Sequence, residues 1–216
     1  MNVRYLTRVI LALLLLAGAA GRLPAAAHPH AWIDLRSSVI LDADGRAVAI
    51  EEEWLFDEFY TVYVTEGLDQ SPGAIAKALT ELARANLQNL KPYGYFTQVR
   101  ADGTKVTVGT VTEFDSSLRD GRLWLRFVVP LDTPIDPKRQ KMVFSVFDPT
   151  YYIEMLHLEG DVIAFRGSGA DGCFGRTQPP NPTAEAVMLA AALDRNAKAD
   201  NTLGELFAER VIVTCK

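Results

Sequence analysis

The feature that most constrains the fold is a turn signal between two long β-type runs near the start of the chain. Asp42-Ala43-Asp44-Gly45 separates residues 32–41 from residues 48–56, and both runs are rich in apolar and aromatic side chains. Asp-Gly between such runs is a strong short-range signal for a β-hairpin. With Asp44-Gly45 as a two-residue turn, the register places Trp32 opposite Asp57.

The remaining sequence predicts more strands than helices. Ser71 and Pro72 supply an N-cap and a first helical residue, so residues 72–90 are predicted as an amphipathic helix. A second hairpin is predicted around Ala101-Asp102-Gly103, and the Gly- and Pro-rich residues 167–182 are predicted as an ordered loop. Further strands are predicted at 123–129, 142–147, 151–157, 162–165 and 211–213, and further helices at 184–195 and 203–208. The predicted class is α+β, mainly antiparallel hairpins or a sandwich-like sheet, with two or three helices and one disulfide.

Residues 1–27 are interpreted as a cleavable secretory signal. Arg4 and Arg8 precede an apolar run over residues 9–20, and Pro24 is followed by three alanines as a cleavage site. That run is too short to span a membrane. We therefore expect residues 28–216 to form a single periplasmic domain that is not membrane-spanning once processed.

The two cysteines, Cys173 and Cys215, both remain in the mature chain. An even pair in an oxidising compartment is most simply one disulfide, which would join the C-terminal strand to an upstream loop. Two zinc-binding thiolates are the other interpretation, but CxxC-type spacing is missing.

The charge balance bears on the partner. The leader carries three arginines and no acids, so its removal makes the net charge −8 instead of −5. This argues against a nucleic-acid partner and suits a partner that handles cations. The other interpretation is that the acidity only keeps an exported protein soluble.

The mature N-terminus concentrates potential metal ligands. Cleavage after Ala27 would expose the amine of His28, and His30 and Asp34 share one strand face with Trp32. The hairpin register brings Asp57 diagonal to His30 and Asp34. Imidazoles, an amine and carboxylates suit Zn²⁺, Ni²⁺, Co²⁺ or Cu²⁺ rather than calcium or magnesium. Alternatively, the histidines belong to a frayed terminus and the aspartates to solvated strand edges. His157, the third histidine, closes a predicted strand, where a hydrogen-bonded structural role is the simpler interpretation.

Three motifs together indicate a family. They are His28-Pro29-His30-Ala31-Trp32-Ile33-Asp34, Trp54-Leu55-Phe56-Asp57-Glu58-Phe59-Tyr60 and Phe147-Asp148-Pro149-Thr150-Tyr151-Tyr152. With them, the chain resembles the ZevA-like domain-of-unknown-function family of bacterial periplasmic proteins over essentially its whole mature length. The resemblance implies a partner for an inner-membrane permease of the nickel, cobalt and zinc kind.

Carried over by position, the motif residues are His28, His30, Asp57, Glu58 and Asp148, and we infer that they act as ligands. Asp148-Pro149 is also a turn former, so Asp148 has a purely structural interpretation. Glu58 falls on the opposite strand face from Asp57, and only a helix starting at Asp57 would bring both carboxylates to one site. Tyr151 and Tyr152 are expected to face opposite ways, one toward the core and one toward the surface.

Three functional hypotheses follow. The first is a periplasmic accessory protein that binds a divalent transition metal, zinc before nickel or cobalt, and passes it to an inner-membrane metal permease without catalysis. The second is an interaction module that docks on or gates a permease and binds no metal. The third is a copper protein with a histidine clamp formed by His28 and another imidazole. Pro29 excludes a clamp built from successive deprotonated amides, because proline has no N–H.

Overall fold

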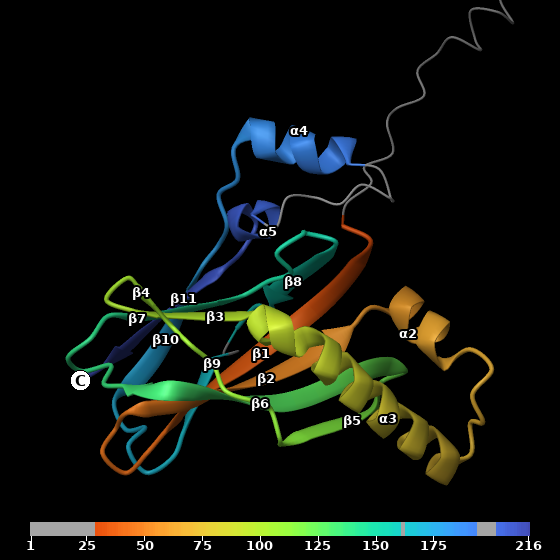
Figure 1. Cartoon of the computed structure of the whole chain (residues 1–216), viewed down its shortest axis with the longest axis horizontal. Coiled ribbons are helices and arrows are strands. Elements are labelled where there is room, and N and C mark those ends of the chain that lie inside the picture. Colours follow the sequence, from red (N-terminus) through yellow and green to blue (C-terminus); the bar gives the residue numbers. More distant parts are fainter. Residues whose placement is uncertain (1–28, 161–162, 194–201) are drawn as a thin grey trace, which may run out of the picture.

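The computed structural model describes residues 29–160, 163–193 and 202–216. The predicted leader and His28 lie outside these residues. Two sheets, four α-helices and one 3-10 helix make up the described chain (Figure 1). The predicted α+β class with mainly antiparallel strands is confirmed.

The first sheet has the order β5-β6-β2-β1-β8, and β9 also pairs with β1. Its pairs are antiparallel, except that β1 lies parallel to both β8 and β9. We call this sheet A. Its strands are β1 (Ala31–Leu41), β2 (Ala47–Phe56), β5 (Phe114–Arg119), β6 (Arg122–Ile135), β8 (Ile153–His157) and β9 (Ile163–Arg166).

The second sheet, sheet B, is antiparallel throughout and has the order β10-β11-β7-β3-β4. Its strands are β3 (Thr97–Ala101), β4 (Thr104–Val106), β7 (Met142–Val146), β10 (Cys173–Gln178) and β11 (Arg210–Cys215). One face of each sheet contributes to a single hydrophobic cluster, in which Trp54 and Phe127 of sheet A join Val99 and Phe144 of sheet B. The core therefore lies between the sheets.

Four α-helices and one 3-10 helix complete the described fold, and α3 (Pro72–Leu90) packs against the hydrophobic cluster. They are α2 (Glu58–Thr65), α3 (Pro72–Leu90), α4 (Ala184–Ala192) and α5 (Leu203–Leu206), and the 3-10 helix η1 spans Lys91–Phe96. The prediction of a helix over residues 72–90 is confirmed. Leu79, Ala83 and Leu87 of α3 enter the central cluster, and Arg84 lies over the Phe114 ring of β5. None of the helices in the described part of the chain is long and apolar enough to cross a membrane.

Several sequence predictions need correction. Residues 167–182 are not one loop, because Cys173–Gln178 forms β10 beside β11. The predicted disulfide is confirmed, but Cys173 and Cys215 face each other across two paired strands, rather than joining a strand to a loop. α2 and β5 were not among the predicted elements.

Candidate functional site

The hairpin register places Asp57 opposite Trp32, as the sequence predicts. The backbone N–H of Asp57 donates to the Trp32 carbonyl at 2.9 Å, and the Trp32 N–H donates to Oδ2 of Asp57 at 3.0 Å. The turn differs in detail, because a register shift between Ile40 and Leu41 lies just before it. Beyond that irregularity the pairing runs unbroken to Ile33 and Phe56.

Asp57 also decides where the chain leaves the sheet. Its Oδ1 accepts the Tyr60 N–H at 2.9 Å, which makes it the N-cap of α2. A carboxylate at this position satisfies a backbone donor that the first helical turn leaves open. The chain turns into a helix at Glu58 instead of continuing the strand. Asp57 and Glu58 therefore do not point to opposite faces of a strand, and both line one pocket.

Both carboxylate residues line a shallow pocket of about 330 Å³ at the start of β1. Its other lining residues are Trp32, Phe59 and Arg122. Trp32 and Phe59 are exposed, with 44% and 85% of their surfaces accessible. The pocket thus combines two carboxylates with an aromatic rim beside the segment that carries the N-terminal histidines.

Asp34, predicted as a metal ligand, forms an ion pair with Arg122. Its Oδ2 accepts from Nη1 of Arg122 at 2.8 Å, and the same guanidinium donates to the carbonyls of Phe56 and Leu55 at 2.7 and 3.0 Å. Asp34 therefore holds a cation at the end of β2. Because this oxygen already accepts from a guanidinium, Asp34 is poorly suited as a ligand.

His28 lies outside the described residues, and His30 lies directly before β1. The His30 N–H donates to the Tyr152 carbonyl at 2.8 Å, and the two rings are 4.7 Å apart between centroids. Within the described ranges, no three His, Cys, Asp or Glu side chains are grouped so that they could hold a metal ion.

Asp148 organises its own loop. Its carboxylate is buried and accepts hydrogen bonds from the backbone N–H groups of Thr150, Tyr152 and Ile153, at 2.9 to 3.1 Å. The Thr150 hydroxyl also donates to it. These contacts favour the turn interpretation over the ligand interpretation. The loop buries Tyr151 and leaves Tyr152 exposed, which confirms the expectation that they face opposite ways.

A buried polar chain crosses the core, and sequence reasoning missed it. Nε2 of His157 lies 2.9 Å from Oγ of Ser37, and its Nδ1 lies 3.0 Å from Oε2 of Glu209. Ser37 in turn contacts Oε2 of Glu52 at 2.9 Å. One signal was present in the sequence. Glu51-Glu52-Glu53 occupy a central strand, and alternation along a strand forces one member of such a run to face inward.

Burial raises the pKa of Glu52 to about 8, although bonds from Ser37 and Trp54 act to lower it. At neutral pH its carboxyl therefore carries a proton, while the hydroxyl of Ser37 donates to its Oε2 and Nε2 of His157 lies beside the same hydroxyl. The order serine, histidine, carboxylate resembles that of a hydrolase triad, but Ser37 is only 2% exposed. A nucleophile needs an accessible oxygen, so we assign this chain a structural role.

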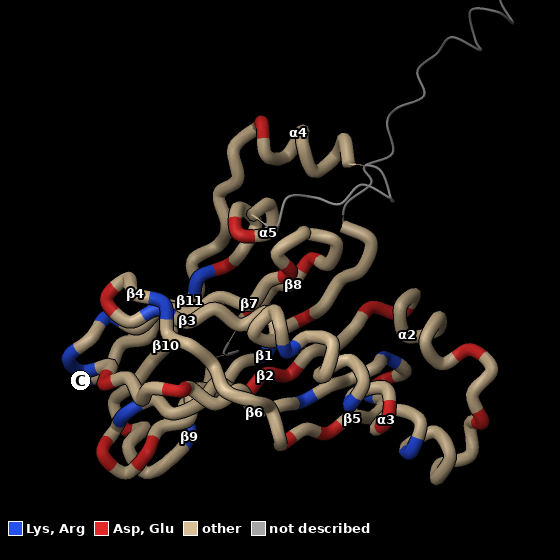
Figure 2. Tube along the Cα trace, in the orientation of Figure 1, with Lys and Arg blue, Asp and Glu red and all other residues tan. Residues whose placement is uncertain are grey.

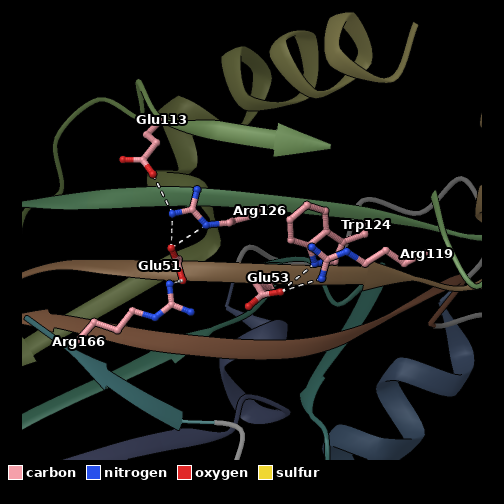
Figure 3. A network of polar contacts seen from close by, with 7 residues as sticks. All are labelled: Glu51, Glu53, Glu113, Arg119, Trp124, Arg126 and Arg166. Atoms are coloured by element: carbon pink, nitrogen blue, oxygen red, sulfur yellow. Dashed lines mark hydrogen bonds and ion pairs between the residues drawn. The ribbon is translucent and has the colours of Figure 1, made fainter. Parts of the chain in front are cut away.

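The opposite face of sheet A carries a network of arginines and carboxylates (Figure 3). Glu51 is fully buried between Arg126 and Arg166, with 2.7 Å from its Oε1 to Nη1 of Arg166. Arg126 also pairs with Glu113 at 2.8 Å. Beside them Glu53 accepts from the Trp124 indole at 3.0 Å, and the Arg119 guanidinium lies 3.2 Å from that ring's centroid. The cations of this network each have a carboxylate partner.

Comparisons with known proteins add a family but no activity. Residues 12–215 match the family model described as "Protein of unknown function (DUF1007)". A protein of Haemophilus influenzae named "Uncharacterized protein" is 24% identical over 192 residues, which is 88% of this chain and 92% of that protein. An "Uncharacterized 15.5 kDa protein in trpE 3'region" of Spirochaeta aurantia is 34% identical over 90 residues, covering 42% of this chain and 64% of that protein.

Proposed function

The chain belongs to the DUF1007 family, and from this premise we propose that it is a periplasmic accessory protein that captures a divalent transition metal and passes it to an inner-membrane permease. Zinc is the first candidate, followed by nickel and cobalt. The disulfide between Cys173 and Cys215 is consistent with a compartment outside the cytoplasm. The ZevA-like motifs at the N-terminus and around Asp57 support the link to a metal permease.

One observation carries the proposal. The carboxylate residues Asp57 and Glu58 line one pocket at the start of β1, the strand that directly follows His28 and His30. Imidazole and carboxylate donors together suit zinc and its neighbours in the transition series. The oxygens of Asp34, Asp148 and Asp57 already accept hydrogen bonds, from Arg122, from the Asp148 loop and from Trp32 and Tyr60. Glu58 is therefore the first carboxylate candidate beside the two histidines.

The proposal is tested by native mass spectrometry of protein processed in the periplasm and titrated with zinc, nickel, cobalt and copper. We expect one tightly held metal ion, lost in the His28→Ala/His30→Ala form and weakened in Glu58→Gln. Glu66→Gln, at the far end of α2, is the matched control and should bind as wild type does. Binding of native affinity in the double histidine variant would contradict the proposal. Copper preference with oxygen consumption would instead favour the histidine-clamp hypothesis.

The second candidate is a docking module that binds no metal, and a feature of α2 favours it. Phe59, Val62 and Tyr63 are exposed by 85%, 67% and 76%, although the opposite side of the same short helix already packs on the core. Neighbouring exposed apolar side chains of this kind mark interaction surfaces. Phe59→Ser/Tyr63→Ser should then abolish permease-dependent metal accumulation in cells, whereas His28→Ala/His30→Ala should leave it intact. The reverse pattern would favour metal capture.

A further inference from the structure

The outer face of sheet B carries positive charge that the protein leaves unneutralised. Side chains on this face alternate with buried ones, and its five cations are Arg100, Lys105, Lys141, Arg176 and Arg210. Throughout the described ranges, none of these five makes an ion pair within 4.0 Å. On sheet A, by contrast, Arg119, Arg122, Arg126 and Arg166 each make an ion pair, and Arg36 of β1 is the exception among the described arginines of that sheet.

Strand register gathers these groups into rows. Arg100, Val143, Ile212 and Arg176 are partners in one row across β3, β7, β11 and β10. The next row on the same face pairs Gln98 with Ser145, and Gln178 with Arg210. Figure 2 shows Lys and Arg positions around β4 and β7 and at the start of β11, on the side of the molecule where sheet B lies. Amide and hydroxyl groups thus lie between the cations.

The face is hollowed where the rows meet α5. A cavity of about 400 Å³ is lined by Arg100, Lys141 and Arg210, with Gln98, Ser145 and Gln178 between them. A second hollow of about 470 Å³ continues from it and shares Gln178, Glu205 and Arg210 with it. Glu205 is the carboxylate residue among the described lining groups of both hollows. The volume of each falls in the range of small-molecule sites.

We propose that this hollow binds a small organic anion that carries at least two carboxylate or phosphate groups. Three cations around one cavity repel each other and attract negative charge. Arg and Lys donate charge-assisted hydrogen bonds to such oxygens, and the amides and the serine hydroxyl bind the remaining oxygens. In a chain with a net charge of −5, this concentration of cations is not a general property of the surface.

The spacing of the cations fits a ligand that carries more than one anionic group. Arg100 and Arg210 lie two strands and two residues apart in the register, which places their Cα atoms about 12 Å from each other. A ligand with two or more such groups engages Arg100 and Lys141 at one end and Arg210 at the other. The site is independent of the proposed metal site, which lies at the start of β1 and recognises a cation.

Isothermal titration calorimetry with citrate and with tripolyphosphate tests the proposal on the full processed protein. We expect saturable binding that weakens as salt is added, because the attraction is electrostatic. Arg100→Gln/Arg210→Gln should weaken it about tenfold or more, since each lost contact involves a charged donor. Lys77→Gln/Lys91→Gln, which removes two exposed charges near α3, is the matched control and should retain wild-type affinity.

Other outcomes would overturn the proposal. Equal weakening in both double variants would mean that the binding follows net charge alone. No saturable binding of either probe at millimolar concentration would exclude a small-anion site. Binding to phosphatidylglycerol vesicles but not to the soluble probes, with loss in Arg100→Gln/Arg210→Gln, would assign the face to a lipid surface. Circular dichroism of each variant confirms that a loss of binding is not a loss of fold.

Discussion

A single residue, Glu52, introduces a proton into the core. Most buried carboxyl groups are paired with a cation, but Glu52 instead accepts a hydrogen bond from the hydroxyl of Ser37. Because no cation pairs with it in the described part of the chain, burial holds the Glu52 carboxyl in its neutral form. At neutral pH Glu52 is therefore buried in the core without an uncompensated charge.

Glu52 should make stability depend on pH. Its pKa rises from 4.5 in the unfolded chain to about 8 in the folded protein, so the folded state retains a proton that the unfolded state releases. This contribution to the unfolding free energy is complete below pH 4.5 and is lost as the pH rises through 8. Over that window we expect a loss of a few kcal/mol in wild type, at about 1.4 kcal/mol per unit of pKa shift.

Glu52→Gln should remove most of the decrease in unfolding free energy with rising pH, because the amide carries no proton to release. Urea unfolding from pH 4.5 to 8.5 measures it, with Glu81→Gln on the exposed side of α3 as the control. Identical slopes in wild type and Glu52→Gln would show that the Glu52 carboxyl is not held neutral.

Asp57 makes a second prediction at this scale. It caps α2 through Tyr60 and closes the hairpin through Trp32, so Asp57→Ala removes an acceptor for both N–H groups. We expect a loss of about 1–2 kcal/mol of unfolding free energy, measured in urea. Asp57→Asn keeps one amide oxygen and should recover part of it. Unchanged stability in the alanine variant would mean that water replaces both contacts.

At the scale of elements, α5 depends on one glycine. A Cβ built on Gly204 would overlap the carbonyl oxygen of Asp148, and the Gly204 N–H donates to the Pro149 carbonyl at 2.9 Å. The short helix therefore packs directly on the backbone of the Asp148 loop. Tyr151 of that loop stacks on Phe207 at 3.9 Å between centroids, just beyond α5.

Gly204→Ala should separate α5 from the Asp148 loop. We expect a lower unfolding temperature and faster amide exchange in residues 148–153, because the backbone contact cannot relax around the new methyl group. Gly73→Ala in the first turn of α3 is the control, since nothing lies within 4 Å of its Cβ position. That variant should match or exceed wild type in stability. A Gly204→Ala variant as stable as wild type would show that α5 moves freely.

Elements with a strong local signal were predictable, and those set by one side chain or by a distant partner were not. Residues 72–90 start with a proline and have helical spacing, and they form α3 with Ser71 at the N-cap position, although the Ser71 side chain makes no capping hydrogen bond. α2 was missed because the apolar run Phe59-Tyr60 also reads as the continuation of β2, and the turn depends on the Asp57 cap. β10 was missed because Gly- and Arg-containing Cys173–Gln178 has little strand propensity and owes its form to pairing with β11.

At the scale of the whole molecule, one covalent link fastens the end of the chain. The disulfide between Cys173 and Cys215 joins residues 42 positions apart and lies beside the hydrophobic cluster. In the chain-entropy model, closing such a loop stabilises the fold by about 4 kcal/mol. Cys173→Ala/Cys215→Ala should therefore lose about that amount in urea unfolding. If the variant matches oxidised wild type, pairing between β10 and β11 alone fixes the terminus.

The parts of the candidate site that depend on local sequence were predictable, and the parts that depend on distant residues were not. Counting along the hairpin correctly placed Asp57 beside Trp32, because register follows from the turn and the apolar pattern. The ion pair of Asp34 with Arg122 was beyond reach, since residues 88 positions apart meet only after the sheet assembles. The Ser37, His157 and Glu209 contacts were hidden for the same reason, as was the basic hollow on sheet B.

The parallel pairing of β1 has a consequence for synthesis. β1 gains its first neighbour from β2, but its other edge is completed by Ile153–His157 and Ile163–Arg166, which leave the ribosome last among the strands of sheet A. Until then, an N-terminal strand with a long open edge is exposed to pairing with other chains. A nascent or translocating chain can therefore form the β1–β2 hairpin but leaves the second edge of β1 unpaired until residues 153–166 are available, and a chaperone that shields extended segments would protect this edge.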